Sequence, residues 1–129
     1  MGELQIARII LFVKDIDLMV SFYEDVLRLS RTNSPDDSEG FVSFDVGAAQ
    51  LALHQIPETY ARNITISDPP VARGDTPIKL AFGAENVSQI SAELKSRGAA
   101  MGPVQEFGSL HLCDGMDPEG NIFQISNRP

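Results

Sequence analysis

The stretch Asp117-Pro118-Glu119-Gly120-Asn121-Ile122-Phe123-Gln124-Ile125 decides the fold of this chain. Proline presets its own φ angle, glycine accepts a positive φ, and Asp and Asn side chains bond back to the backbone, so residues 117–121 predict a tight turn. The apolar residues that follow predict a last strand. Alternation along this strand puts Gln124 on the face opposite Phe123 and Ile125. A polar residue on the inner face of a last strand suggests a site.

Upstream of this turn, the hydrophobic pattern predicts strands and two helices. Asp15 and Asn86 each precede a helical apolar stripe and can cap a helix, with Gln89 at the capping-box position after Asn86. Gly98 can end the second helix. The predicted elements, in order, are strand 6–13, helix 16–28, strands 41–46 and 50–56, strand 77–83, helix 87–97, and strands 104–107, 110–113 and 122–126.

These elements form an internal repeat. Superposing Asp15 on Asn86, an offset of 71 residues, aligns the two helices and the strands before them. Arg8 then falls on Lys79, so both strands are interrupted by a cation at the same place. We therefore expect one domain of two repeated modules, at about 4–56 and 77–128. Residues 57–76, with several prolines and little periodicity, are expected to form a long connector or lid.

Composition excludes several classes of protein. The formal net charge of −8 over 129 residues argues against a nucleic-acid partner, since a phosphate backbone needs a basic surface. No apolar run approaches the length of a membrane span, and no basic region leads into an apolar stretch as in a signal peptide. The single cysteine, Cys113, excludes an internal disulfide framework and fits a reducing compartment. We expect a cytoplasmic protein.

The arrangement and three motifs resemble the vicinal oxygen chelate superfamily, which groups glyoxalase I, bleomycin-resistance proteins, fosfomycin-resistance enzymes and extradiol dioxygenases. The motifs are Phe12-Val13-Lys14-Asp15-Ile16, Ser21-Phe22-Tyr23-Glu24-Asp25-Val26-Leu27 and Asp117-Pro118-Glu119-Gly120-Asn121. The resemblance implies a glyoxalase/bleomycin-resistance-like α+β fold, in which two β-α-β-β-β modules form a curved mixed sheet around a cleft. It also implies a homodimer. Because this fold hosts many chemistries, it does not fix the function.

The resemblance places metal ligands on the first and last strands of each module. In this chain the corresponding residues are Arg8, Ala52, Lys79 and Gln124, where His or Glu is usual. Arginine has no lone pair to donate and alanine has no donor atom, so these four residues make no metal site. No cofactor is therefore predicted. A divalent metal held by relocated ligands, His54 and His111, remains the alternative.

Two charged residues suggest the nature of the ligand. Arg8 and Lys79, projecting into one cleft, would attract a carboxylate or phosphate, with Gln124 adding a neutral hydrogen bond. Alternatively, each cation pairs with an acid of the protein itself. The acidic composition favours a cationic ligand instead, so the charge of the ligand stays open.

Other residues complete the candidate site. Ser109, His111 and Cys113 are expected to line the cleft beside Gln124, with Leu110 and Leu112 entering the core. Cys113 is interpreted as a buried, unreactive thiol. Phe12, Phe41, Phe44 and Tyr60 are candidate pocket walls, although aromatic residues on strands also commonly belong to the core. The candidate ligand-binding residues are therefore Arg8, Phe12, Ala52, His54, Tyr60, Lys79, His111 and Gln124, and no catalytic residue is predicted.

Three functions are consistent with these features. The first is a metal-independent protein that binds a small molecule in the cleft, resembling bleomycin-resistance proteins. The second is a glyoxalase- or dioxygenase-like enzyme (a lyase, isomerase or oxidoreductase) with relocated metal ligands or metal-free acid–base chemistry. The third is an interaction module whose cleft is filled by its own side chains. Turnover that chelators abolish would favour the metal-dependent enzyme.

Overall fold

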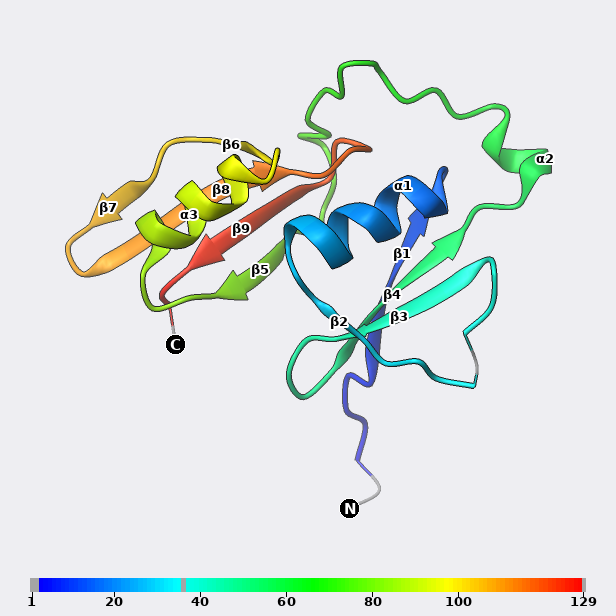
Figure 1. Ribbon diagram of the computed structural model, residues 1–129, viewed down its shortest axis with the longest axis horizontal. Helices are drawn as coiled ribbons and strands as arrows, with labels where there is room; N and C mark the ends of the chain where they lie inside the picture. The colour runs from blue at the N-terminus through cyan, green and yellow to red at the C-terminus, as the bar shows by residue number, and fades with distance from the viewer. Residues whose placement is uncertain (1–2, 36, 129) are drawn as a thin grey trace. The chain divides into compact units, whose positions relative to one another are not determined.

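A computed structural model describes residues 3–35 and 37–128 of the chain (Figure 1). It divides into two compact units, Met1–Thr65 and Ile66–Pro129. Each unit combines a mixed β-sheet with a helical segment, so the predicted α+β class is confirmed. Among the described residues, no helix has the length and apolar character needed to cross a membrane.

The first unit contains a four-stranded sheet in the order β1-β4-β3-β2. β1 pairs with β4 in parallel, and the other neighbours are antiparallel. Two elements were not predicted, because β2 has only two residues and α2 only four. The elements are β1 (Arg8–Val13), α1 (Ile16–Ser21), a π-helical turn η1 (Phe22–Val26), β2 (Ser30–Arg31), β3 (Phe41–Asp45), β4 (Gln50–Gln55) and α2 (Glu58–Ala61).

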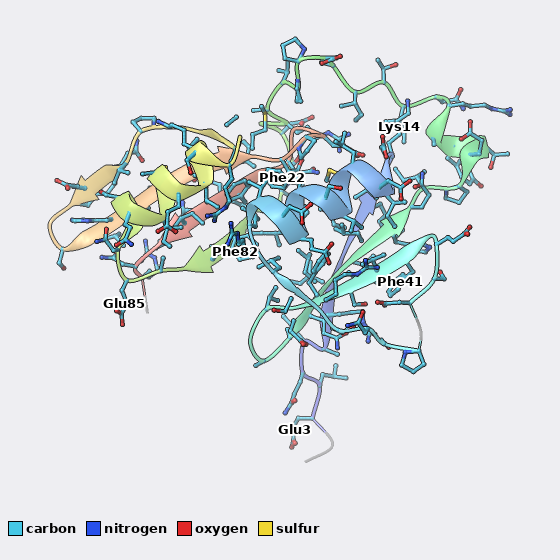
Figure 2. All side chains as sticks on the ribbon, in the orientation of Figure 1. Glu3, Lys14, Phe22, Phe41, Phe82 and Glu85 are labelled. Carbon is cyan, nitrogen blue, oxygen red and sulfur yellow. The ribbon has the colours of Figure 1, made fainter. Side chains whose placement is uncertain are left out.

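The first helix begins where the sequence predicts. The side chain of Asp15 accepts a hydrogen bond from the Leu18 backbone N–H at 3.1 Å, as an N-cap should. The prediction of one regular helix over 16–28 is wrong in its second half, because α1 is followed by the π-helical turn η1, whose first residue, Phe22, is labelled in Figure 2. Phe22 and Tyr23 are both buried, and their rings meet edge to face with centroids 5.2 Å apart. Both follow the buried residue Met19, by three and four positions, and so lie on the apolar face of the helix.

The second unit has a five-stranded sheet, with the path β5-β9-β8-β6 and with β7 also paired to β8. Only β5 and β9 are parallel neighbours. The elements are β5 (Leu80–Gly83), α3 (Val87–Ser96), β6 (Ala100–Met101), β7 (Gln105–Phe107), β8 (Leu110–Met116) and β9 (Ile122–Ser126).

The predicted ends of α3 are confirmed. The Asn86 side chain accepts a hydrogen bond from the Gln89 N–H at 3.0 Å, and Gly98 has a φ of +100° just after the helix. In a full capping box the Gln89 side chain would also bond to the Asn86 backbone N–H, but here it bonds to a residue further along the helix. The Gln89 amide donates to the carboxylate of Glu93 at 3.2 Å.

The two sheets have matching strand orders and registers. Ile10 is opposite Ala52 in unit 1, and Ala81 is opposite Gln124 in unit 2. The first members of these pairs are 71 residues apart and the second members 72 apart, because the turn between β8 and β9 is one residue longer than the turn between β3 and β4. The sequence offset therefore corresponds to structurally equivalent positions.

The connector is held at both ends rather than free throughout. In unit 1, Ala61 of α2 is buried, and the Lys14 ammonium donates to the Ile64 carbonyl. In unit 2, the Arg73 N–H donates to the carbonyl of Gly120 at 2.9 Å. A Cβ at Gly120 would lie 2.3 Å from the Val71 carbonyl oxygen, so only glycine allows this close approach.

Candidate functional site

One face of the unit 1 sheet is covered by helix α1. The Gln55 side-chain oxygen accepts a hydrogen bond from the Ile16 N–H at the start of α1, at 3.1 Å. Leu51 and Leu53, which alternate with Gln55 along β4, are therefore on the helix-covered face and are buried. The opposite face, here called the helix-free face of unit 1, carries Arg8, Ile10 and Phe12 from β1, Gln50, Ala52 and His54 from β4, and Phe41, Ser43 and Asp45 from β3.

An aromatic row crosses one end of the helix-free face. The Phe12 ring stacks on the His54 imidazole, with centroids 5.4 Å apart and planes inclined by 29°. Phe41 approaches the same imidazole edge-on, also at 5.4 Å. Both contacts have the geometry that aromatic pairs prefer. Phe12 remains 57% exposed, so two predicted site residues, Phe12 and His54, meet here at an accessible surface.

Small buried residues lie next to this aromatic row. Ala52 and Ser43 are paired across β4 and β3, and both are almost completely buried. Ile10, their neighbour on β1, is 44% exposed. The predicted site residue Ala52 is therefore covered by its neighbours, and Ile10 is the accessible residue of this middle row.

A polar row crosses the other end of the helix-free face. The Arg8 guanidinium donates to the side-chain oxygen of Gln50 at 3.4 Å, and Arg8 is exposed. Asp45 lies in the same row on β3, two strands away from Arg8. Within the described part of the chain, no acidic side chain forms an ion pair with Arg8. Its charge is therefore not neutralised by a direct partner.

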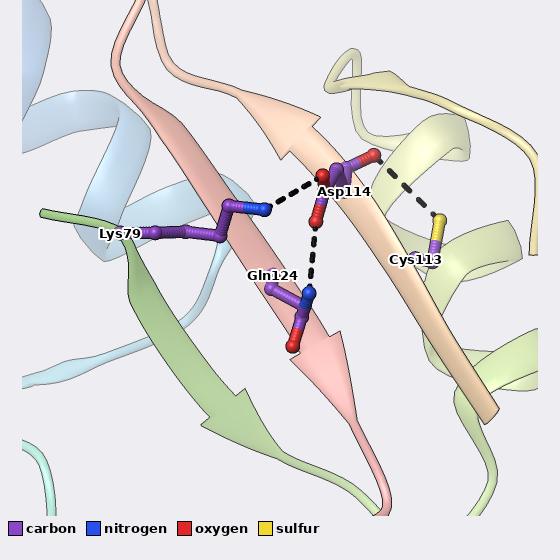
Figure 3. A network of polar contacts seen from close by, with 4 residues as sticks. All are labelled: Lys79, Cys113, Asp114 and Gln124. Atoms are coloured by element: carbon purple, nitrogen blue, oxygen red, sulfur yellow. Dashed lines mark hydrogen bonds and ion pairs between the residues drawn. The ribbon is translucent and has the colours of Figure 1, made fainter. Parts of the chain in front are cut away.

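Unit 2 presents a polar network on the corresponding face (Figure 3). The Lys79 ammonium lies 3.0 Å from Oδ2 of Asp114, and the Gln124 amide donates to Oδ1 of the same carboxylate at 3.2 Å. Lys79 and Gln124 were predicted as site residues, and the structure brings them to one carboxylate. Asp114 was not predicted, because the strand was expected to end at Cys113. Lys79 thus pairs with an acid of the protein itself.

The expected placement of Ser109, His111 and Cys113 beside Gln124 is wrong. Asp114, and not Cys113, is the residue opposite Gln124, while Cys113 is opposite Ile125. Alternate residues of a strand point to opposite faces, so the odd-numbered set of β8 faces α3. Cys113 is fully buried there, with its sulfur 3.4 Å from the Ser91 hydroxyl and donating to the Gly102 carbonyl at 3.1 Å.

The remaining predicted residues lie apart from these clusters within their own units. Nε2 of His111 is 3.8 Å from a carboxylate oxygen of Glu106 on the neighbouring strand β7. Tyr60 is exposed on α2 and lies in neither row of the helix-free face. Among residues 3–35 and 37–128, no hydrogen bond, ion pair or ring contact joins His111 or Tyr60 to the aromatic or polar groups described above.

The side chains present do not fit a metal ion. At the positions implied by the family resemblance, Arg8 and Ala52 offer no donor, and Lys79 is engaged as an ammonium. Among residues 3–35 and 37–128, no group of three or more His, Cys, Asp or Glu side chains is arranged to hold a metal. No step of chemistry is therefore assigned to a metal.

A separate groove lies along α3 on the helix-covered side of unit 2. It has a volume of about 460 Å³ and is lined by Ser88, Ser91 and Ser96, by Lys95 and by residues 102–104. None of the predicted site residues lines it. Ser91 and Gly102, which contact the Cys113 sulfur, form part of its wall.

Comparisons with known proteins agree on the fold. The model of the Glyoxalase/Bleomycin resistance protein/Dioxygenase superfamily matches residues 5–125. A search of curated proteins finds no match. One similar solved structure is TnmS3, an antibiotic binding protein from Streptomyces sp. CB03234, with a TM-score of 0.70 and 18% identity over 97% of this chain and 96% of that chain. A second is a glyoxalase/bleomycin resistance protein/dioxygenase family enzyme from Burkholderia phytofirmans PsJN, with a TM-score of 0.71 and 22% identity over 93% of this chain and 95% of that chain. A third is a glyoxalase/bleomycin resistance protein/dioxygenase from Nocardioides, with a TM-score of 0.68 and 18% identity over 98% of this chain and 84% of that chain.

At these identities the solved structures show the fold alone, whereas the family model spans nearly the whole chain. The chain belongs to the Glyoxalase/Bleomycin resistance protein/Dioxygenase superfamily.

Proposed function

We propose that this protein binds a small organic molecule, without a metal ion, on the helix-free face of unit 1. The observation that carries the proposal is the exposure of Phe12 and Ile10, two apolar residues on the same face of β1, next to the His54 and Phe41 rings. Exposed apolar side chains that adjoin one another on a surface are a feature of binding sites, whereas single exposed ones are common on any protein. Polar groups at the edge of such a surface orient a ligand.

Two further observations support binding rather than metal catalysis. The side chains at the family's metal positions lack a suitable donor set, as described above. In addition, TnmS3, which shares the fold, is an antibiotic binding protein. We extend that kind of role to this chain as part of the proposal, and we expect the protein to act in the cytoplasm, where its single thiol stays reduced.

The test is a screen of small molecules by thermal stabilisation, because a ligand that binds only the folded state raises the melting temperature. Each compound found is then titrated against Phe12→Leu and against a matched control, Phe107→Leu, which alters an equally exposed phenylalanine on β7. We expect Phe12→Leu to weaken binding several-fold and Phe107→Leu to leave it unchanged. A broad screen that yields no ligand, or ligands indifferent to Phe12, would contradict the proposal.

A further inference from the structure

The helix-free face of unit 1 is chemically different at its two ends. Register across β1, β4 and β3 arranges its residues in three rows. The polar row is Arg8, Gln50 and Asp45, the middle row is Ile10, Ala52 and Ser43, and the aromatic row is Phe12, His54 and Phe41. A ligand that covers the face must therefore be polar at one end and apolar at the other.

The aromatic end favours a planar ring. Phe12, His54 and Phe41 already form a chain of ring contacts, stacked on one side of the imidazole and edge-on at the other. Phe12 is on β1, the end strand of the sheet, and more than half of its surface is exposed. An added aromatic ring can extend this row by stacking or edge contact, which contributes beyond simple burial of area.

The polar end favours an anion. Arg8 uses one donor group on the neutral amide of Gln50, and a guanidinium has five N–H donors in all. Asp45 is in the same row, but two strand spacings place its Cα about 9–10 Å from that of Arg8. Lys79 differs from Arg8, because the Asp114 carboxylate already neutralises it. Arg8 is thus the better anchor for a carboxylate, which matches its fork of donors.

The distance between the two ends limits the size of the ligand. Arg8 and Phe12 are four residues apart on one strand, about 13 Å between their Cα atoms. The Arg8 side chain is long enough to extend along the sheet toward Ile10, the exposed residue of the middle row. A single ring with a short acidic side chain covers the span that remains.

We propose that the ligand is a small aromatic anion, with its ring in the aromatic row and its carboxylate on Arg8. This inference rests on the proposed function, since it names the chemical class of ligand for the same face. It departs from the sequence-based expectation of an anion shared by Arg8 and Lys79, because Lys79 already has its own carboxylate partner.

The probe is 4-phenylbutyrate, titrated calorimetrically into the full chain at constant ionic strength. Two matched compounds separate the contributions: 4-phenylbutyramide lacks the charge, and 4-cyclohexylbutyrate lacks the aromatic ring. We expect the amide to bind about ten-fold more weakly than the acid, because it loses one charge-assisted hydrogen-bonded pair with Arg8. We also expect the cyclohexyl acid to bind several-fold more weakly than the phenyl acid.

Variants assign each effect to a residue. Arg8→Met keeps the length of the side chain and should abolish the preference for acid over amide. Phe12→Leu should abolish the preference for phenyl over cyclohexyl. The control Lys95→Met removes an exposed cation from α3 and should leave every affinity within two-fold.

Two results would overturn the inference in different ways. If acid and amide bind equally well and Phe12→Leu weakens both, the ligand is aromatic but not anionic, and the proposed function still stands. If 4-phenylbutyrate does not bind at all, the aromatic-anion class is wrong, and the wider compound screen then decides the proposed function separately.

Discussion

Lys79 and Asp114, 35 residues apart in the chain, form an ion pair with 3.0 Å between Nζ and Oδ2, and Gln124 donates to the other oxygen of the same carboxylate. The side chains of Lys79 and Asp114 are 43% and 45% exposed, so water screens their attraction. A pair of this kind contributes about 0.2–1 kcal/mol to stability. Its main effect is on the charge that unit 2 offers to a ligand.

We therefore predict that Lys79→Met lowers the free energy of unfolding by less than about 1 kcal/mol, as measured by urea denaturation. Asp114→Asn should cost similarly little while leaving Lys79 with an uncompensated charge. Asp114→Asn should consequently raise the affinity for anionic ligands, measured by titration, whereas Lys79→Met should not. A loss of several kcal/mol on removing Lys79 would show that the pair is a structural support.

Gly120 allows a matched test of close backbone approach. Gly120→Ala must accommodate both a φ of +85° and a Cβ placed 2.3 Å from the Val71 carbonyl oxygen. Gly47→Ala faces a φ of +104° with no atom within 4 Å of the new Cβ. We predict a loss of about 1 kcal/mol for Gly47→Ala and a clearly larger loss for Gly120→Ala, measured by chemical denaturation. Equal losses would mean that the connector moves away without cost.

The metal content of the purified, untagged protein should be well below one ion per chain. Nickel, manganese, zinc or iron should not raise its melting temperature, because the described side chains supply no donor set for these ions. Stoichiometric metal that is lost in both His54→Ala and His111→Ala would instead support the enzyme with relocated ligands. Turnover abolished by a chelator would lead to the same conclusion.

Assembly in solution is a further prediction, which the family resemblance suggests. β1 is the end strand of its sheet, and Ile9 and Ile10 on it are exposed. We expect light scattering to give twice the chain mass of 14.1 kDa. Ile9→Lys should shift the protein toward monomer, because a lysine on an edge strand opposes pairing. Leu18→Lys, on the exposed side of α1, is the control and should leave the mass unchanged.

Local sequence signals predicted the starts of α1 and α3 and the turn before β9. The caps at Asp15 and Asn86 depend on residues three apart in the chain, so a single sequence contains all that determines them. The turn at residues 117–121 is equally local. Oδ1 of Asp117 accepts hydrogen bonds from the backbone N–H groups of Glu119 and Asn121, both at 2.9 Å.

Signals that depend on pairing between distant strands were harder to predict. The two-residue strands β2 and β6 exist only through their partners, and the end of β8 was placed three residues too early. Leu110 and Leu112 suggested that the even-numbered residues of β8 face the core. The pairing of β8 with β9 instead places the odd-numbered residues Cys113 and Gly115 on the core side. A Cβ at Gly115 would lie 2.5 Å from the Met101 sulfur, so its absence allows that packing. No pattern within β8 alone reveals this, and Asp114 was missed for the same reason.

The burial of Cys113 gives this protein a built-in reporter of its own opening. The chain has a single thiol, it is fully buried beneath α3, and it lies in unit 2. A thiol reagent can therefore react only when that unit opens, and the rate of labelling measures how often it does so. Unit 1 has no thiol, so its fluctuations leave no trace in the signal. The stability of one half of the molecule can be followed without a tag or an engineered residue.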